Sequence, residues 1–436
     1  MRRNLFNIVA LGVFLANGNL AWGLEKTKVY EVASGSRPAI ATDNTQGLYV
    51  AYESPVTYNG AKAIRDGNGH VHSVEGTSWT LPGIWFVQSG IGGEEKWSYP
   101  ETLPVFTASH QPAIAIEKNG AIDIVMTSST DSATAPADIF FTRSTDGGHT
   151  WSKAIDIAAT PGESSEPAMA IDSDNSIHVV WSDTSRGEDH RDIFYSYSKD
   201  GGKTWGKDPL LPADNISSTS GRSIQPAIAI SDDGSIHVAW LDSTPGETHP
   251  DIYYSYKTNN VWSEPLNLSH SSRMSSHPGI ACGADGKVYV CWSDNSRKED
   301  ATDIWCAIST RYGHFARALN ISNTPGVAGE PAIAADNAGN VTIVWSDTSN
   351  TPDKPDIYCR ISTNGASGFS NVINLSHTIA VAKHPTAILA GKAMLATWDE
   401  TDGAIKQIKL GSMEFKNLAM GPVLNVDPGL NLHASK

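Results

Sequence analysis

Apolar and polar positions alternate with a period of two along most of the chain, in short runs separated by turn residues. The stretch from Pro167 to Trp205 shows the pattern in full: an apolar run after Pro167, an Asp/Asn/Ser turn, the run Ile177–Trp181, a polar loop, and the run Asp192–Tyr197. A period of two is that of a β-strand, whereas a helix would repeat its apolar positions every 3.6 residues. The stretch therefore predicts three strands, with Trp205 opening a fourth.

This unit is repeated along the chain. The proline that opens it recurs at intervals of 52 to 59 residues after a first interval of 74, at Pro38, Pro112, Pro167, Pro226, Pro278, Pro331 and Pro385. About four short strands in each unit are typical of a propeller blade. We therefore predict an all-β fold, a seven-bladed β-propeller of four-stranded antiparallel blades. A six-bladed ring with one additional unit is the alternative.

The ends of the repeat indicate how the ring closes. The last unit lacks a clear fourth strand after Leu410, and the segment Lys28–Val32 reads as a strand without a partner. Pairing this segment with Ile405–Leu410 would close the ring and remove two open sheet edges. In the competing closure, the tail around Met413–Leu418 supplies the missing strand.

The N-terminus has the pattern of a secretory signal. Arg2 and Arg3 precede a largely apolar run from Leu5 to Ala16, and Ala21-Trp22-Gly23 is a small-x-small cleavage site. The apolar run is too short to span a bilayer as an anchor helix. We predict a signal peptide over residues 1–23, the propeller over 24–410 and a C-terminal extension over 411–436. The mature protein would then be secreted, periplasmic or on the cell surface, with no membrane span.

Charge and cysteine content narrow the classes of function. The net charge of −15 argues against nucleic acid or an anionic membrane as the partner, because both attract basic surfaces. The four cysteines have no Cys-x-x-Cys spacing, so we expect no zinc site, and nothing else in the sequence calls for a metal or cofactor. Disulfide bonds and buried free thiols both remain open. Acidic turns such as Asp172–Ser176 suit hairpin chemistry better than calcium binding.

Two further features have alternative interpretations. The first unit contains a long insertion from about Ser54 to Leu81, which is either a lid over one end of the ring or a solvated excursion. Asn-x-Ser recurs at Asn215, Asn267, Asn320 and Asn374. This is a glycosylation pattern, but it recurs because each fourth strand ends alike.

Two segments match the Asp-box, Ser-x-Asp-x-Gly-x-Thr-Trp. The matching residues are Ser144, Asp146, Gly148, Thr150 and Trp151, and then Ser198, Asp200, Gly202, Thr204 and Trp205. With the repeat, the chain resembles the sialidase-like Asp-box (BNR repeat) β-propeller superfamily from about Lys28 to Leu410. The resemblance implies that the boxes are structural and lie between third and fourth strands, on the face opposite the usual ligand site.

The same resemblance allows a test for sialidase residues. Retaining sialidases need an arginine cluster for the substrate carboxylate, a tyrosine nucleophile activated by a glutamate, and an aspartic acid. Ser36-Arg37-Pro38-Ala39-Ile40 stands where the family has its first arginine, in an Arg-Ile-Pro motif, but it lacks the intervening residue. The other arginines and the Tyr–Glu pair have no convincing match. We therefore expect no sialidase activity and assign no catalytic residue.

The residues before the opening prolines should form a ring at the mouth of the central channel. They are Arg37, Gln111, Glu166, Gln225, His277, Glu330 and His384, and His110 lies beside them. All are polar, yet they differ between units while the Trp and Asp framework repeats. We predict that they bind the ligand. The alternative is that these residues are polar only because the rim of the channel faces solvent.

The leading hypothesis is an exported, non-catalytic propeller that binds a glycan or a cell-surface or envelope protein at its channel face. The alternative is a glycan-active enzyme. A sialidase-like hydrolase would use Arg37 with Glu166 or Glu330, and a polysaccharide lyase would use His277 or His384 as base. A scaffold in a larger envelope assembly is a third possibility. A Tyr–Glu pair near two arginines would favour hydrolysis, and His, Arg and Tyr together would favour elimination. If neither arrangement is present, binding without catalysis is favoured.

Overall fold

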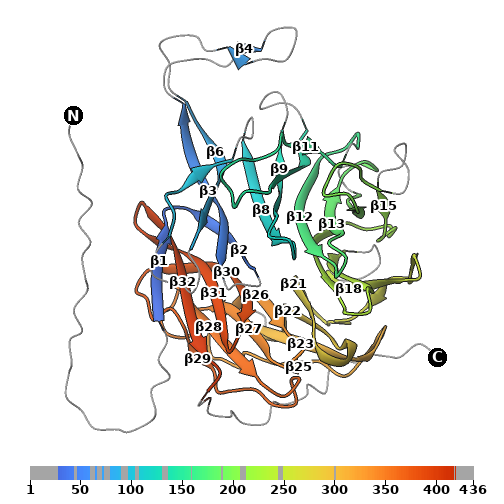
Figure 1. Ribbon diagram of the computed structural model, residues 1–436. Helices are drawn as coiled ribbons and strands as arrows, with labels where there is room; N and C mark the ends of the chain where they lie inside the picture. The colour runs from blue at the N-terminus through green and yellow to red at the C-terminus, as the bar shows by residue number, and fades with distance from the viewer. Residues whose placement is uncertain are drawn as a thin grey trace.

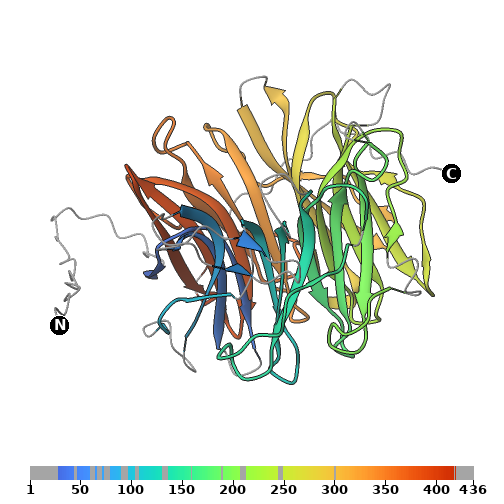
Figure 2. The same ribbon diagram turned by 90° about the horizontal axis from the view of Figure 1, so that it is seen from above.

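The computed structural model describes residues 28–43, 47–58, 64–65, 71–72, 79–89, 97–103, 108–129, 136–158, 160–187, 190–206, 213–243, 249–298, 301–416 and 418. The signal peptide predicted over 1–23 and most of the extension predicted over 411–436 lie outside these ranges. The described residues form seven antiparallel sheets around a common axis (Figure 1). Viewed across the axis, the sheets stand side by side as the blades of a propeller (Figure 2). The prediction of an all-β, seven-bladed propeller is confirmed.

Blades 1 to 6 take their strands in chain order, and the strands of each blade are given from the channel outward. Blade 1 consists of β2 (Ser36–Thr42), β3 (Leu48–Tyr58), β6 (Trp79–Gln88) and β7 (Glu101–Thr102). Blade 2 consists of β8 (Ser109–Ile116), β9 (Ile122–Ser128), β10 (Asp138–Ser144) and β11 (Ile155–Asp156). Blade 3 consists of β12 (Ser164–Ile171), β13 (Ile177–Asp183), β14 (Asp192–Ser198) and β15 (Asp214–Asn215). A hairpin of β4 (Ile64–Arg65) and β5 (Val71–His72) lies within the insertion of blade 1.

Blades 4 and 5 have a split outer strand. Blade 4 consists of β16 (Ser223–Ile230), β17 (Ile236–Asp242), β18 (Asp251–Thr258), β19 (Val261–Trp262) and β20 (Leu266–Asn267). Blade 5 consists of β21 (Ser275–Cys282), β22 (Val288–Lys298), β23 (Ala301–Arg311), β24 (His314–Phe315) and β25 (Leu319–Asn320), with the 3₁₀ turn η1 (Ala284–Gly286) between its first two strands. Blade 6 is β26 (Ala328–Ala335), β27 (Val341–Asp347), β28 (Asp356–Ser362) and β29 (Ile373–Asn374).

Blade 7 closes the ring with strands from both ends of the repeat. It consists of β30 (Val381–Ala390), β31 (Ala393–Asp402), β32 (Ile405–Glu414) and β1 (Lys28–Ala33). β1 lies beside β32 in Figure 1, and their antiparallel register places Lys28 opposite Ser412 and Tyr30 opposite Leu410. The first of the two predicted closures is confirmed. Because β32 ends at Glu414, the last strand is longer than the repeat pattern indicated.

The insertion of blade 1 is shorter than expected. We expected it to run from about Ser54 to Leu81, but β3 and β6 pair continuously up to Tyr58 and Trp79. The β-branched and aromatic residues in these extensions favour strand, which explains the longer hairpin. The remainder of the insertion, apart from its short hairpin, lies outside the described residues.

The core lies between the blades. The tryptophans that repeat within the second strands of five blades are completely buried: Trp181, Trp240, Trp292, Trp345 and Trp398. They contribute to separate apolar clusters, each shared by two neighbouring sheets. Since burial of one large side chain contributes roughly 2–3 kcal/mol, these repeated positions stabilise the ring rather than bind ligand.

The two complete Asp-boxes form hydrogen-bonded turns. Asp146 accepts the backbone N–H of Thr150 (2.8 Å) and its hydroxyl (2.6 Å), while Ser144 Oγ accepts the N–H of Gly148 (2.8 Å). The second box repeats these contacts around Asp200. The box tryptophans pack edge-on against aromatic rings of the preceding blade, at centroid distances of 5.3 and 5.2 Å.

A glycine pair tests how tightly the boxes pack. Gly202 has φ +81°, and a Cβ there would lie 2.1 Å from Cε1 of the buried Phe141. Gly234 has nearly the same φ, +79°, with no atom near the added Cβ. We expect Gly234→Ala to cost about 1 kcal/mol of unfolding free energy, from backbone strain alone, and Gly202→Ala about 2 kcal/mol more. Urea unfolding of the two variants measures the difference, and equal losses would contradict the packing argument.

The repeated Asn-x-Ser segments have a structural explanation. In blade 4, Asn267 donates its side-chain amide to Asp251 (2.8 Å), and Ser269 donates its hydroxyl to the same carboxylate (2.5 Å). The Asn carbonyl then accepts the N–H of His270. Blades 3 and 6 repeat the arrangement. The motif therefore holds the fourth strand onto the Asp that begins the third.

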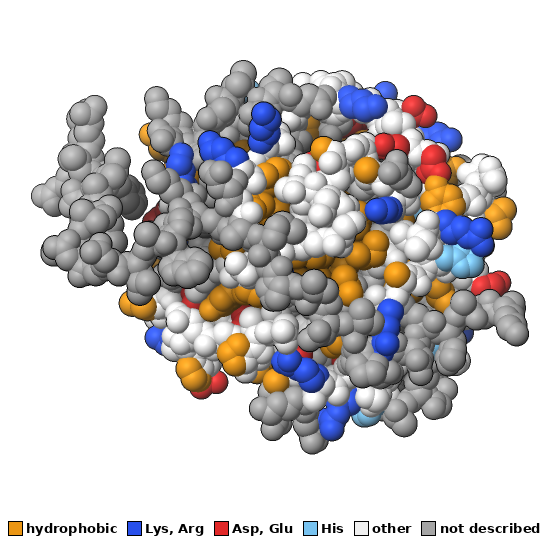
Figure 3. Space-filling model, turned by 90° about the horizontal axis from the view of Figure 1, so that it is seen from below, with side chains coloured by type: hydrophobic (Ala, Val, Ile, Leu, Met, Phe, Trp, Pro, Cys, Tyr) orange, Lys and Arg blue, Asp and Glu red, His pale blue; other side chains and the backbone are white. Residues whose placement is uncertain are grey.

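Three smaller observations complete the description. All four cysteines are free thiols. None of the helical segments in the described part of the chain has the length and apolar character that a membrane crossing requires. On the face shown in Figure 3, Lys and Arg side chains are scattered and form no continuous basic patch.

Candidate functional site at the channel mouth

The seven residues before the opening prolines share one backbone conformation. Each first strand carries a bulge there, so that two residues face one on the second strand. All seven have positive φ, between 48° and 57°. A non-glycine residue in this region is uncommon and strained, and a bulge changes the direction in which a side chain points. We call these seven residues the ring.

Six of the seven ring N–H groups donate to a side chain of the preceding blade. Within the ring itself, Gln111, Glu166, Gln225 and Glu330 accept the N–H of the ring residue in the next blade, at 2.8 to 3.0 Å. Where the ring residue is Arg37 or His384, a residue of the second strand accepts instead: Glu53 binds Gln111 N (2.8 Å) and Asp399 binds Arg37 N (3.2 Å). These bonds link neighbouring blades and offset the strain of the positive φ.

This pattern divides the ring into two sets. The glutamines and glutamates are acceptors and are already used between blades. Arg37, His277 and His384 are the basic members, and none of them holds the next blade. No side-chain acceptor is found among the described residues for the N–H of Glu330, the neighbour of His277. Arg37 and His384 are ion-paired with Glu53 and Asp399, so the donors that can still meet a ligand here are the remaining N–H groups of Arg37, His277 and His384.

The junction of blades 7, 1 and 2 concentrates these groups. Arg37 Nη1 lies 3.6 Å from Glu53 Oε1, and His110 Nδ1 lies 3.8 Å from Glu53 Oε2. Arg37 and His110 are about half exposed, whereas Glu53 is only 13% exposed. Burial alone would raise the pKa of Glu53, but hydrogen bonds from His110 and Gln111 and the charge of Arg37 lower it. Glu53 is therefore a carboxylate that fixes its basic neighbours.

The two ring histidines differ in electrostatic environment. His384 Nδ1 lies 2.6 Å from Asp399 Oδ1. Burial and the charge of Arg37 lower the pKa of His384, but Asp399 and Glu330 raise it by more, so the pKa is raised overall. His277 is exposed to the channel, but the surrounding walls desolvate its ring and lower its pKa, despite the charges of Glu330 and Glu166. His384 therefore keeps its proton to a higher pH than His277 does.

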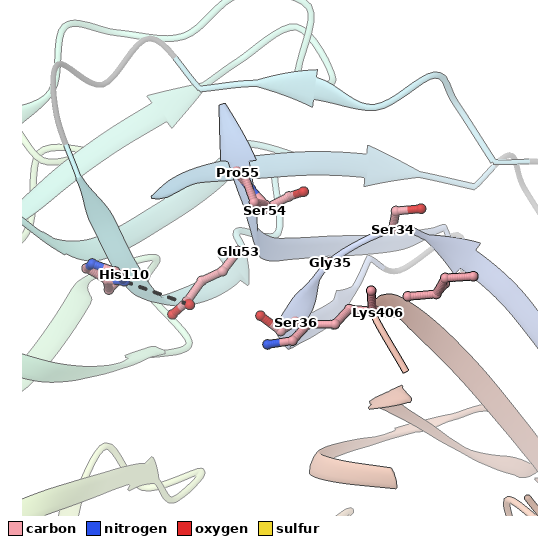
Figure 4. Close-up of a pocket in the computed structure, with 10 residues that line it drawn as sticks. Ser34, Gly35, Ser36, Glu53, Ser54, Pro55, His110 and Lys406 are labelled. Atoms are coloured by element: carbon pink, nitrogen blue, oxygen red, sulfur yellow. Dashed lines mark ion pairs between the residues drawn. The ribbon is translucent and has the colours of Figure 1, made fainter. Parts of the chain in front are cut away.

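A cavity of about 680 Å³ opens beside this junction. It is lined by Ser34, Gly35, Ser36, Glu53, Ser54, Pro55, His110, Ala404, Ile405 and Lys406. Figure 4 shows Glu53 and His110 at one side of the cavity and Lys406 next to Ser36 at the other. Its volume is in the range of small-ligand pockets.

The structure brings only some of the expected residues into contact with the cavity. His110 lines it, and Arg37 adjoins it through Glu53. Gln111, Glu166, Gln225 and Glu330 lie on the ring but are bonded between blades. Glu53, Asp399 and Lys406 were not expected. Glu53 and Asp399 directly follow the repeated aromatic of the second strand, a position where none of the five other blades has an acid, and this is the signal that could have identified them.

Among the described residues, no group of three or more His, Cys, Asp and Glu side chains could hold a metal ion. The basic groups in or beside the cavity are Arg37, His110 and Lys406, and serine hydroxyls are further donors in its lining. A carboxylate or sulfate is the group that such donors bind best, because guanidinium and ammonium hydrogen bonds to anions are charge-assisted.

Comparisons with known proteins identify the fold. No protein-family model matches the sequence, and no curated protein sequence matches it significantly. A solved structure of a Dyadobacter fermentans protein of unknown function aligns with 90% of this chain and 98% of its own, at 13% identity and TM-score 0.52. An ulvan lyase of polysaccharide lyase family 25 aligns over 91% and 98%, at 11% identity and TM-score 0.56. A Hadza microbial sialidase aligns over 91% and 97%, at 13% identity and TM-score 0.48.

The chain thus has the seven-bladed β-propeller fold that its repeats led us to expect, and the ulvan lyase structure aligns with it over nearly its whole length. At identities of 11–13%, the likeness establishes the fold alone and assigns no activity.

Proposed function

We propose that this protein is an exported propeller that binds an anionic glycan at its channel mouth. One observation carries the proposal: the acidic and amide ring residues accept hydrogen bonds between blades, whereas Arg37 and His384 keep N–H groups beyond their ion pairs with Glu53 and Asp399. The guanidinium fork of Arg37 matches a carboxylate, and the protonated form of His384 would add a second donor.

Two further points support a sugar acid as the ligand. The adjoining cavity combines serine hydroxyls with apolar groups, which suits a sugar ring. The ulvan lyase on this fold is described as bound to an oligomer of GlcA and Rha3S, so the architecture can accommodate an anionic polysaccharide. The ring and the side chains bonded to it include one arginine and no tyrosine, which supports binding over sialidase-type hydrolysis.

Replacement of Arg37 by alanine tests the proposal. We expect Arg37→Ala to weaken the binding of uronate oligosaccharides at least tenfold, equivalent to about 1.4 kcal/mol, because it removes the bidentate donor. Calorimetric titration with oligomers of galacturonate, mannuronate and hyaluronan measures the effect. Arg311→Ala is the control, since Arg311 is an exposed residue at the far end of a third strand. Equal binding of neutral and anionic oligomers would contradict the proposal.

A second function is favoured by the contrasting histidines. In β-elimination on a uronate, a base removes the C5 proton, the C4–O bond breaks, a C4=C5 double bond forms and the leaving oxygen takes up a proton. A neutral His277 could act as base while Arg37 and a protonated His384 bind the carboxylate, since opposite pKa shifts separate basic from acidic roles. Ultraviolet absorbance of the conjugated product distinguishes elimination from binding alone.

A further inference from the structure

We infer that Lys406 forms a second anion subsite, so that the ligand is an oligosaccharide with negative charges on successive units. The inference deepens the proposed function and depends on it: Arg37 would hold one acidic unit and Lys406 the next. The cavity between them would hold the linked sugar rings.

The charge of Lys406 is not neutralised within the cavity. Glu53 is the acidic residue that lines the cavity, and its carboxylate already accepts Gln111 N–H and lies against Arg37 and His110. Lys409 on the same strand lies 3.7 Å from Glu31 and 2.8 Å from Gln407, whereas no ion pair of Lys406 is found among the described residues. Lys406 thus presents an exposed ammonium group in a cavity where the carboxylate of Glu53 already has other partners. Such a group favours an anionic ligand.

The lining between the two cations suits a saccharide chain. Ser34, Ser36 and Ser54 offer hydroxyl groups, and Pro55 and Ile405 offer apolar surface. Ile405 is 62% exposed, which is high for a large aliphatic side chain. Exposed apolar groups beside hydrogen-bonding groups commonly mark a binding surface, because a sugar ring presents C–H faces and hydroxyl edges together.

Ring closure fixes the position of Lys406. The N–H of Gly35 donates to the carbonyl of Lys406 at 3.2 Å, which joins the start of blade 1 to the last strand of blade 7. Gly35 has no room for a side chain, because a Cβ would lie 2.4 Å from the ring of Tyr52 and 2.6 Å from the carbonyl of Glu53. The closed ring therefore links the backbone at Lys406 to the segment that leads into Arg37.

Oligomers of increasing length test this arrangement in the full-length protein. Galacturonic acid, digalacturonate and trigalacturonate, together with mannuronate and hyaluronan oligomers, are titrated calorimetrically. We expect a dimer with two carboxylates to bind at least tenfold more tightly than the monomer. Lys406→Met, which keeps the apolar stem, should remove most of this gain and leave monomer binding unchanged. Lys392→Met, in the hairpin between β30 and β31 at the other end of the blade, should change neither.

The outcomes separate the two proposals. Monomer binding that depends on Arg37, with no gain from the second unit or with a gain that Lys406→Met retains, overturns the second subsite and leaves the proposed function intact. If no anionic oligomer binds, both are overturned. A thermal unfolding profile of Lys406→Met equal to that of the unmodified protein confirms that the variant is folded.

Discussion

Replacing Asp356 with alanine is expected to lower the free energy of unfolding by about 4 kcal/mol. Asp356 is 1% exposed and accepts four donors: the side-chain amides of Asn350 and Asn374, the hydroxyl of Ser376 and the N–H of Thr378, at 2.8 to 3.1 Å. Removal of the carboxylate leaves these donors without their acceptor, and each such buried group costs roughly 1–3 kcal/mol. The loss is partly reduced because some of the donors reach solvent.

Urea unfolding followed by tryptophan fluorescence measures this effect. Asp174→Ala is the matched control, because Asp174 lies exposed in a hairpin turn and should change stability by less than about 0.5 kcal/mol. Asp356→Asn should fall between the two, since one oxygen remains as an acceptor. A loss for Asp356→Ala no larger than that of the control would show that this network does not hold the fourth strand.

The same network explains why the fold could be predicted from the sequence. The Asp at the start of the third strand and the Asn-x-Ser of the fourth recur in blades 3 to 6, because each of these blades holds its fourth strand through the same hydrogen bonds. The buried tryptophans recur for the same reason, since each packs against the neighbouring sheet. Repeated physical requirements leave a repeated pattern, and the period of that pattern fixed the blade number and the choice of closing strand.

Blade 6 contains a turn with the geometry of the Asp-box that the sequence motif does not identify. The turn Ser362–Phe369 of blade 6 has Asn364 where the box has Asp and Ala366 where it has Gly, so it does not match the motif. Nevertheless, Ser362 Oγ accepts the N–H of Ala366 (3.0 Å) and Asn364 Oδ1 accepts that of Gly368 (3.1 Å). The geometry of the box thus persists with a neutral acceptor and a positive φ of 60° at Ala366.

The candidate site was less predictable, for a spatial reason. The ring positions could be identified from the prolines, but which of their side chains are used between blades depends on contacts across two sheets. The cavity forms where β1, β32 and blade 1 meet. Lys406 and Ser34 lie far apart in the sequence and share no motif, so their proximity could not be predicted. Glu53 and Asp399 act as substitutes where the ring residue is basic, which only the arrangement of neighbouring blades reveals.

Anion binding at the channel mouth should weaken as pH rises from 5 to 8, by roughly tenfold in total. A uronate carboxylate stays ionised over this range, since its pKa lies near that of an α-carboxyl group, about 3.5. His384 has a raised pKa, so it carries its charge at pH 6.5 and loses it as pH rises through the folded-state value above 6.5. His277 has a lowered pKa, so it gains charge only as pH falls below 6.5.

Two variants assign these steps. His384→Gln should remove the loss of affinity above pH 6.5, and His277→Gln should remove the gain below it, as measured by titration with a uronate dimer at each pH. Elimination would behave differently, because it requires a neutral His277 and a protonated His384 at once. Its rate should therefore follow a bell-shaped pH profile with its maximum between the pKa values of the two histidines, and His277→Gln should lower it by about 10² or more. Affinity that is independent of pH in all three proteins would show that neither histidine contacts the bound anion.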